Sequence, residues 1–362
     1  MSDPNTMSKS DNTHASREDS LPVGKIPSLL LGRLLAGIEA TDERVIVGPG
    51  IGRDAAVIEL GDRLLVAKTD PITFATDQSS RYLVNVNAND LACVGAQPRW
   101  MMVTALLPEG QTTESLIATL FAELIEASRE RGITLIGGHT EITAGLGRPI
   151  LIGMLLGEST RERLLAPGQA HPGDRIMVVE PIAVEGTALI AKEFPGELAK
   201  HFDAEFVERC ANMLFEPGIS IVDQAETLLD TGGISALHDP TEGGLASGIR
   251  ELGVASSCGA VVNRSLIPVM PETQAICDHF GMDPLGMLAS GSLLAAVRPD
   301  RVSEVERACQ KRGYAASVIG KLTVPDRGFT MIVDGESREL PLFAADEVAR
   351  LFAGRGDTAE KP

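Results

Sequence analysis

Several features that would place a protein in a common class are missing from this sequence of 362 residues. It has no stretch of about 18 uncharged apolar residues, which a membrane-spanning helix would require. Aromatic residues make up only 4% of the chain, too few for the stacking surfaces that bind single-stranded nucleic acids. Basic residues number 32 against 50 acidic ones, for a net charge of −18. This balance argues against nucleic acid and membrane partners, but it permits a phosphate ligand that carboxylates hold through Mg²⁺.

Paired cysteines are also absent. Five cysteines are widely scattered and form no Cys-x-x-Cys motif: Cys93, Cys210, Cys258, Cys277 and Cys309. The segment Met1–Ser20 is polar and lacks the apolar core of a secretion signal. An odd number of unpaired cysteines without a signal is typical of the reducing cytoplasm, where we expect this protein. We expect Met1–Ser20 and Gly354–Pro362 to be disordered tails.

The length of the chain predicts two domains, because 362 residues exceed what one ordinary core organises. A polar segment with proline and glycine, Arg161–Pro172, separates two series of strands and helices. We place the N-terminal domain at 21–160, the C-terminal domain at 161–345, and a helix end with its tail at 346–362. Hairpin-like strand pairs and longer helices in both series indicate an α+β or α/β fold, with helices on one side of a mostly antiparallel sheet.

Local patterns predict the elements that carry the candidate site. A Gly-Asp turn joins two strands, 55–60 and 63–68, in a hairpin. Ser79 or Ser80 is expected to cap the next helix. A short apolar strand over 133–136 is expected to end at the pair of glycines that follows it.

Three isolated aspartates stand at the joints of these elements. Asp54 follows a glycine-rich loop, Asp70 closes the second hairpin strand, and Asp90 lies inside the next helix. Aspartate is mildly unfavourable within a helix, so Asp90 requires a reason. Taken singly, the three have ordinary alternatives: a turn residue, a cap before Pro71 and a solvated helix face. Taken together, hard oxygen ligands from separate rigid elements predict Mg²⁺ on a nucleotide phosphate, without a Walker sequence.

Further candidate groups accompany this acidic set. Lys68 precedes Asp70 by two residues and so lies on the same face of the strand, where it could neutralise a phosphate; the alternative is an ordinary surface lysine. Gly137 and Gly138 would let the backbone approach a ligand closely. An imidazole, a hydroxyl and a carboxylate follow at His139–Glu141, although a histidine that caps a turn explains the first equally well.

The segment Asp239–Gly244 reads as a junction between a strand and a helix, with glycines where the helix begins. Free backbone N–H groups at such a terminus favour an anion. Capping by Thr241 with an acidic first turn at Glu242 fits equally well. His238 stands at the same junction and could carry a proton near neutral pH.

These motifs form an ordered series: Gly52–Val57, Thr69-Asp70, Asn89-Asp90, Gly95–Pro98, Gly137–Thr140, Asp239–Leu245, Ile267–Val269, Gly281–Leu285, Ala289–Gly291 and Ile319-Gly320. In this order they resemble the AIR synthase (PurM)-like superfamily over about Gly24–Leu322. The C-terminal motifs are most similar to those of hydrogenase maturation factor HypE-like proteins.

The resemblance implies a two-domain PurM-like fold, with an N-terminal ferredoxin-like or Bacillus chorismate mutase-like domain that dimerises and a C-terminal α/β domain. It implies a homodimer that uses ATP and Mg²⁺ and phosphorylates an oxygen, with a maturation protein as a possible partner. The implied metal ligands are Asp54, Asp70 and Asp90, with Glu141 as a substitute. The implied nucleotide-binding residues are Gly24, Lys25, Gly50, Gly52, Asn89, Gly137, Gly138 and Thr140. The implied catalytic residues are Lys68, His139 and Asp239.

The sequence departs from the family pattern at informative places. Arg53 and His139 stand where the family often has an acidic residue, so the number of metal ions is open, and Glu242 stands where the maturation factor typically has arginine. The last cysteine is Cys309, so the C-terminal cysteine of HypE has no counterpart and we expect no nitrile synthesis on the chain's own tail. We therefore predict a Mg-ATP-dependent enzyme that phosphorylates an amide, carbonyl or phosphate oxygen. The alternatives are a small-molecule kinase and an ATP-binding assembly partner without catalysis.

Overall fold

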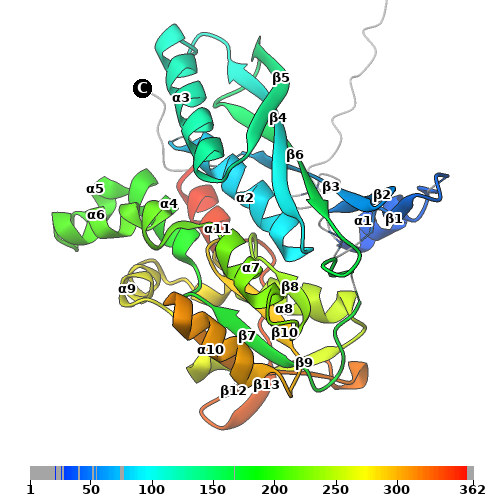
Figure 1. The fold of residues 1–362 in the computed structure, drawn as a ribbon. Coiled ribbons are helices and arrows are strands. Elements are labelled where there is room, and N and C mark those ends of the chain that lie inside the picture. The colour runs from blue at the N-terminus through cyan, green and yellow to red at the C-terminus, as the bar shows by residue number, and fades with distance from the viewer. Residues whose placement is uncertain are drawn as a thin grey trace, which may run out of the picture.

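The computed structural model describes residues 21, 26, 28–39, 41–50, 53, 55–73, 77–166 and 168–356. Within these residues the strands form two sheets, one from each half of the chain (Figure 1). This confirms the mixed α and β architecture that the sequence predicts. The expectation of helices on one side of each sheet is wrong for the C-terminal half, where the helix Gly244–Ala255 packs on one face of the sheet and the helices Val222–Leu229 and Val302–Arg312 pack on the other. None of the helices in the described part combines the length and apolar character that a membrane span requires.

The N-terminal half contains a sheet whose six described strands run in the order β1-β2-β3-β6-β4-β5. Neighbouring strands are antiparallel except β4 and β5, which are parallel. The predicted hairpin is present, with Gly61 in the left-handed conformation that its turn requires. The elements are α1 (Ser28–Leu35), β1 (Val45–Val47), β2 (Ala56–Leu60), β3 (Arg63–Ile72), α2 (Ser79–Cys93), β4 (Gln97–Pro108), α3 (Glu114–Glu130), β5 (Thr134–Thr143) and β6 (Ile150–Ser159).

The two faces of this sheet differ. On β3, Leu64 and Val66 are buried beneath α2, and the alternation of side chains continues that face to Lys68 and Asp70. On the opposite face Met102 and Met154 lie side by side in register and are 40% and 44% exposed. In a single chain this face therefore presents apolar side chains to solvent.

Helix α2 lies between the two halves, and Arg81 is its one residue that is not buried. One side packs on β3 and β6, whereas Tyr82 belongs to the core of the C-terminal half. Burial on both sides explains why its sequence shows no single apolar stripe. The predicted serine cap is wrong: Gln78 precedes the helix in a left-handed conformation without a side-chain cap, and Ser80 Oγ donates a hydrogen bond to Leu120 O of α3 at 2.8 Å.

The C-terminal half contains a sheet with seven described strands in the order β13-β12-β9-β11-β7-β10-β8, antiparallel except between β12 and β9. Strand β10, which lies between β7 and the edge strand β8, is buried throughout, because its two faces belong to two different clusters of buried residues. The strands are β7 (Arg175–Val179), β8 (Ile234–His238), β9 (Gly259–Asn263), β10 (Leu293–Val297), β11 (Ala316–Thr323), β12 (Phe329–Val333) and β13 (Glu336–Glu339). The helices are α4 (Val184–Glu193), α5 (Pro195–Leu198), α6 (Ala204–Asn212), α7 (Val222–Leu229), α8 (Gly244–Ala255), α9 (Pro271–Phe280), α10 (Val302–Arg312) and α11 (Glu347–Gly356).

Strand β5 corrects one sequence prediction. It does not end before the two glycines but continues through Gly137–Glu141 to Thr143, paired with β4. A side chain at Gly138 would place its Cβ 1.8 Å from Val103 O, so glycine is required for the strands to approach. The glycines thus belong to the sheet rather than to a turn.

Candidate active site

Three of the predicted residues meet between β3 and α2. Lys68 Nζ lies 3.3 Å from an Asp70 carboxylate oxygen and 3.1 Å from Asp90 Oδ2. The side chain of Asp90 is only 6% exposed, compared with 33% for that of Asp70. The charge of Lys68 therefore accounts for an aspartate in the interior of a helix, because a buried carboxylate needs a partner.

Asn87 fixes the position of Asp70 relative to α2. Its Oδ1 accepts a hydrogen bond from the Asp70 N–H at 3.1 Å, and its Nδ2 donates to Leu83 O at 2.8 Å. Helix α2 comes this close because Gly153 of β6 has no side chain: a Cβ there would lie 2.9 Å from Asn87 Nδ2. Asn87 is not among the site residues predicted from the sequence, although it stands one helical turn before Asp90.

The donor set of this cluster fits a Mg²⁺ ion with a phosphate. One ammonium nitrogen touches both carboxylates, so oxygens from two rigid elements converge within reach of one hydrated divalent ion. Asp54, the third predicted ligand, lies outside the described residues, as do Gly24, Lys25 and Gly52. Gly50 lies among the described residues and against the Arg53 side chain. A Cβ added at Gly50 would be only 2.8 Å from that side chain.

His139 and Glu141 do not join this cluster within one chain. Asp70, Gly153, Val103 and Gly138 lie in one row across the sheet, so β5 is three strands, or about 14 Å, from β3. This corrects the expectation that Glu141 completes the aspartate set in a single chain. His139 Nε2 instead lies 3.1 Å from Glu141 Oε2 on the exposed edge strand.

The edge strand nevertheless forms a ligand-sized feature. Gly137, Gly138, His139 and Thr140 line a largely apolar cavity together with residues of α3 such as Phe121. The pKa of Glu141 is lowered by its hydrogen bonds, first with His139 and then with Thr143.

The C-terminal junction is occupied by the protein's own carboxylate. Gly243, with φ of 79°, precedes α8, and its N–H donates to Asp346 Oδ2 at 2.8 Å. Asp346 thus places a carboxylate of the protein itself at this helix terminus, and Gly243 stands at the cap position considered for Thr241. Burial raises the pKa of Asp346 to about 6.

A second buried acid, Glu185 of α4, lies near this junction. Burial raises its pKa to about 7, and the Ser290 N–H donates to its Oε2 at 3.2 Å. Asp239, at the end of β8, is 2% exposed. Neither Glu185 nor Asp346 carries a sequence motif, and burial of their carboxyl groups becomes visible only in the structure.

Asn89 connects the two halves. Its Nδ2 donates to Ile219 O at 2.8 Å, and its Oδ1 accepts from the Ile221 N–H at 2.9 Å. Both ends of a fully buried side chain are thus engaged by the C-terminal half. This contrasts with the expected direct contact to a nucleotide and gives Asn89 a structural role that the sequence analysis missed.

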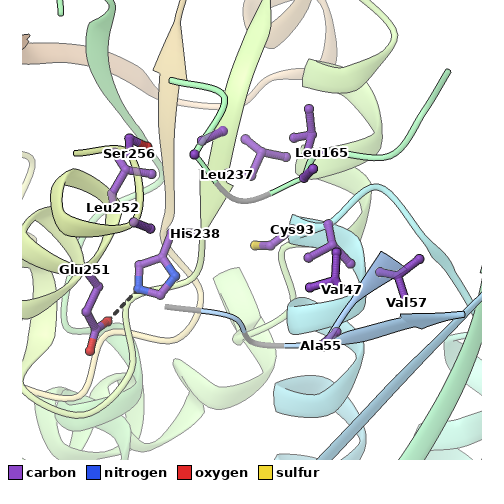
Figure 2. Close-up of a pocket in the computed structure, with 15 residues that line it drawn as sticks. Val47, Ala55, Val57, Cys93, Leu165, Leu237, His238, Glu251, Leu252 and Ser256 are labelled. Atoms are coloured by element: carbon purple, nitrogen blue, oxygen red, sulfur yellow. Dashed lines mark hydrogen bonds and ion pairs between the residues drawn. The ribbon is translucent and has the colours of Figure 1, made fainter. Parts of the chain in front are cut away.

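A pocket between the halves lies beside the end of α2 (Figure 2). Val47 and Val57 line it from the N-terminal sheet, and Cys93 lines it from α2. From the C-terminal half come His238 and Glu251, whose side chains are 2.8 Å apart. His238 therefore faces the space between the halves, and Glu251 is a partner that the sequence analysis did not name.

Known protein families match both halves of the chain. Residues 52–159 match the N-terminal domain, and residues 171–333 the C-terminal domain, of AIR synthase related proteins. The chain belongs to the AIR synthase-related family. Within this family it is 29% identical to the carbamoyl dehydratase HypE of Escherichia coli (strain K12) over 317 residues, which cover 82% of this chain and 87% of that protein.

Solved structures place this AIR synthase-related chain in the same fold. A crystal structure of a HypE–HypF complex matches with a TM-score of 0.70 at 21% identity, covering 87% of this chain and 99% of the other. A crystal structure of the hydrogenase maturation protein HypE in complex with ATP matches with a TM-score of 0.67 at 23% identity, covering 83% and 92%. The predicted PurM-like fold and the resemblance to HypE are thus confirmed.

Proposed function

We propose that this protein is a Mg-ATP-dependent dehydratase of the HypE type, which acts on a carbamoyl group during hydrogenase maturation. The observation that carries the proposal is the position of Lys68 between Asp70 and Asp90. Support comes from its similarity to the E. coli carbamoyl dehydratase and to the structure of HypE with ATP.

The reaction removes water from an amide in two steps. The carbonyl oxygen of the carbamoyl group attacks the γ-phosphorus of ATP, ADP leaves, and the nitrogen loses one proton. Phosphate then leaves from the carbon while the second N–H proton departs, and a nitrile remains. Phosphorylation thus converts a poor leaving group into a good one.

The chain's own residues contribute charge and position. Asp70 and Asp90 would hold Mg²⁺, which when bound neutralises phosphate oxygens. The ammonium of Lys68, which lies between the two carboxylates, would stabilise the negative charge of the transferred phosphoryl group in the transition state. Asp239 and His139 remain our proposals for groups that move a proton.

The five cysteines of this sequence are unsuited to carry the carbamoyl group. All five are buried, and burial raises the pKa of Cys210 and Cys277 to about 12 and that of Cys309 to about 11. A buried neutral thiol is a poor nucleophile and a poor carrier. None of these five thiols is thus suited as the carrier, and a maturation partner protein is the natural source of the carbamoyl group.

The exposed apolar face of the N-terminal sheet supports a homodimer. A homodimer that covers Met102 and Met154 would bury apolar surface and cover the sheet that carries His139 and Glu141. The proposal includes Asp54 as a third Mg²⁺ ligand. It also includes nucleotide contacts by seven residues: Gly24, Lys25, Gly50, Gly52, Gly137, Gly138 and Thr140. We further propose domain limits of 21–160 and 161–345 and a cytoplasmic location.

The test combines ADP release with product analysis. With Mg-ATP and an S-carbamoyl-cysteine peptide, we expect ADP and a peptide that has lost one water and shows a nitrile stretch. Asp70→Asn and Asp90→Asn should lower turnover by about 100-fold or more, whereas the exposed control Asp223→Asn should not. A stable phosphorylated peptide would indicate a kinase. ATP binding without ADP release on any carbamoyl acceptor would indicate an assembly partner.

A further inference from the structure

A cluster of metal-ligating side chains lies in the C-terminal half, apart from the Lys68 site. One donor atom each of Glu197, His201 and His279 lies within 4.8 Å of the others. Glu197 belongs to α5, His201 follows that helix, and His279 lies in the last turn of α9. In Figure 1, α5 and α9 lie on the side of the molecule away from β1 and β2.

The backbone holds these residues in place. Hydrogen bonds from Lys200 N to Glu197 O at 3.1 Å and from His201 N to Leu198 O at 2.9 Å continue the turn after α5. This brings His201 above Glu197, as expected for a spacing of four residues. Helix α9 ends with Gly281 in the left-handed conformation, directly after the turn that presents His279.

The two imidazole rings lie close together beside aromatic side chains. The rings of His201 and His279 are tilted, with centroids 4.3 Å apart. Phe202 and Phe280 contact His279 edge-on and form an aromatic wall on its side. Lys200 Nζ lies 2.9 Å from Glu197 Oε2, so the carboxylate is paired with an ammonium group that a metal ion would have to displace.

We propose that Glu197, His201 and His279 form a site for a divalent transition-metal ion of the zinc type. A set of two imidazoles and one carboxylate binds Zn²⁺ in preference to Mg²⁺ or Ca²⁺. Donors around tetrahedral zinc are about 3.4 Å apart, so the three atoms need only a modest movement, and His201 is exposed and able to make it. Three protein ligands leave the fourth position to water or to a group from another molecule.

The site is independent of the proposed ATP chemistry. Its ligands come from two helical segments of one half, and metal binding would tie the end of α5 to α9. Zn²⁺ should therefore raise the melting temperature, because an ion that binds the folded state stabilises it.

The experiment measures binding of the metal alone to the full chain. Calorimetry with Zn²⁺, and titration with Co²⁺ followed by its visible absorption, should show one site per chain. His201→Ala and His279→Ala should each weaken it by more than about 100-fold, beyond the usual effect of losing an outer-shell partner. The matched control His171→Ala replaces an exposed histidine of the same half and should bind as the parent does.

Lys200→Ala sharpens the test, because it removes the ammonium that competes for Glu197. Zinc should bind several-fold more tightly to this variant, and weaker binding would contradict Glu197 as a ligand. Circular dichroism of each variant without metal distinguishes lost ligands from lost folding. If the double variant His201→Ala, His279→Ala is folded and binds zinc as the parent does, the site lies elsewhere and the proposal is wrong.

Discussion

The two halves of this protein handle their buried carboxylates differently. In the N-terminal half, Asp70 and Asp90 share the ammonium of Lys68. In the C-terminal half, Glu185 and Asp346 accept hydrogen bonds from backbone N–H groups, and burial raises the pKa of both. A carboxylate paired with a lysine can exchange its partner for a metal ion. Burial instead makes Glu185 and Asp346 bind a proton more readily, although their backbone N–H donors act in the opposite direction.

Removal of the shared cation should give the largest effect. Lys68→Met takes the positive charge from two carboxylates and from the incoming phosphate, so ATP turnover should fall by about 100-fold or more. The free energy of unfolding, measured in urea, should fall by about 3 kcal/mol, because breaking a buried ion pair leaves its carboxylate poorly compensated. Lys321→Met, at an exposed lysine, is the control. Equal ATP turnover in both variants would show that Lys68 takes no part in phosphoryl transfer.

The link between the halves should have the next largest effect. Asn89→Ala removes two buried hydrogen bonds to the C-terminal half, from Ile221 and to Ile219. It should cost about 2–4 kcal/mol of stability, since the backbone groups left behind are buried. Asn85→Ala, which loses a bond to Arg81 O within the same helix, should cost less. An equal loss in the two variants would show that Asn89 has no special part in joining the halves.

The acids of the C-terminal half should produce a pH dependence. The pKa of Glu185 is about 7 in the folded protein and 4.5 in the reference state, so the folded state binds the proton more tightly. Stability should therefore decrease as the pH rises from 4.5 to about 7, by about 3 kcal/mol from this group. Glu185→Gln should remove the contribution of this group, most clearly between about pH 6 and 7, and leave that of Asp346 at lower pH. The exposed control Glu306→Gln should retain both contributions. A parent profile without that slope would contradict a buried neutral Glu185.

The smallest effect on stability is expected at the edge strand. His139→Ala removes the largest cause of the lowered pKa of Glu141, so that pKa should rise towards its ordinary value, while stability should barely change. Thr143→Ala removes the second contribution and should shift the pKa less. A titration followed by carboxyl NMR signals measures both. An unchanged pKa of Glu141 in both variants would rule out this local pairing.

The sequence predicts the part of the site that local rules determine. Asp90 is conspicuous because aspartate is unfavourable inside a helix, and Lys68 follows from the two-residue period of a strand. These rules led to a cluster that the structure brings together within 3.3 Å. The two-domain fold is also predictable, from the order of elements and motifs.

The missed features depend on distant contacts. Asn89 bonds with residues 130 and 132 positions away, and Glu185 meets Ser290 across 105 positions. No local pattern encodes such pairs. The continuation of β5 was missed for a related reason: glycines normally interrupt a strand, but here Gly138 is required by the approach of Val103, a residue of another strand.

The burial of helix α2 has a mechanical consequence. Asn89 is bound to the C-terminal half, while its neighbour Asp90 is bound to the lysine of the N-terminal sheet. The helix thus links the two halves mechanically. A rotation of one half against the other would change the distances within the Lys68 ion pair unless the hydrogen bonds of Asn89 broke first.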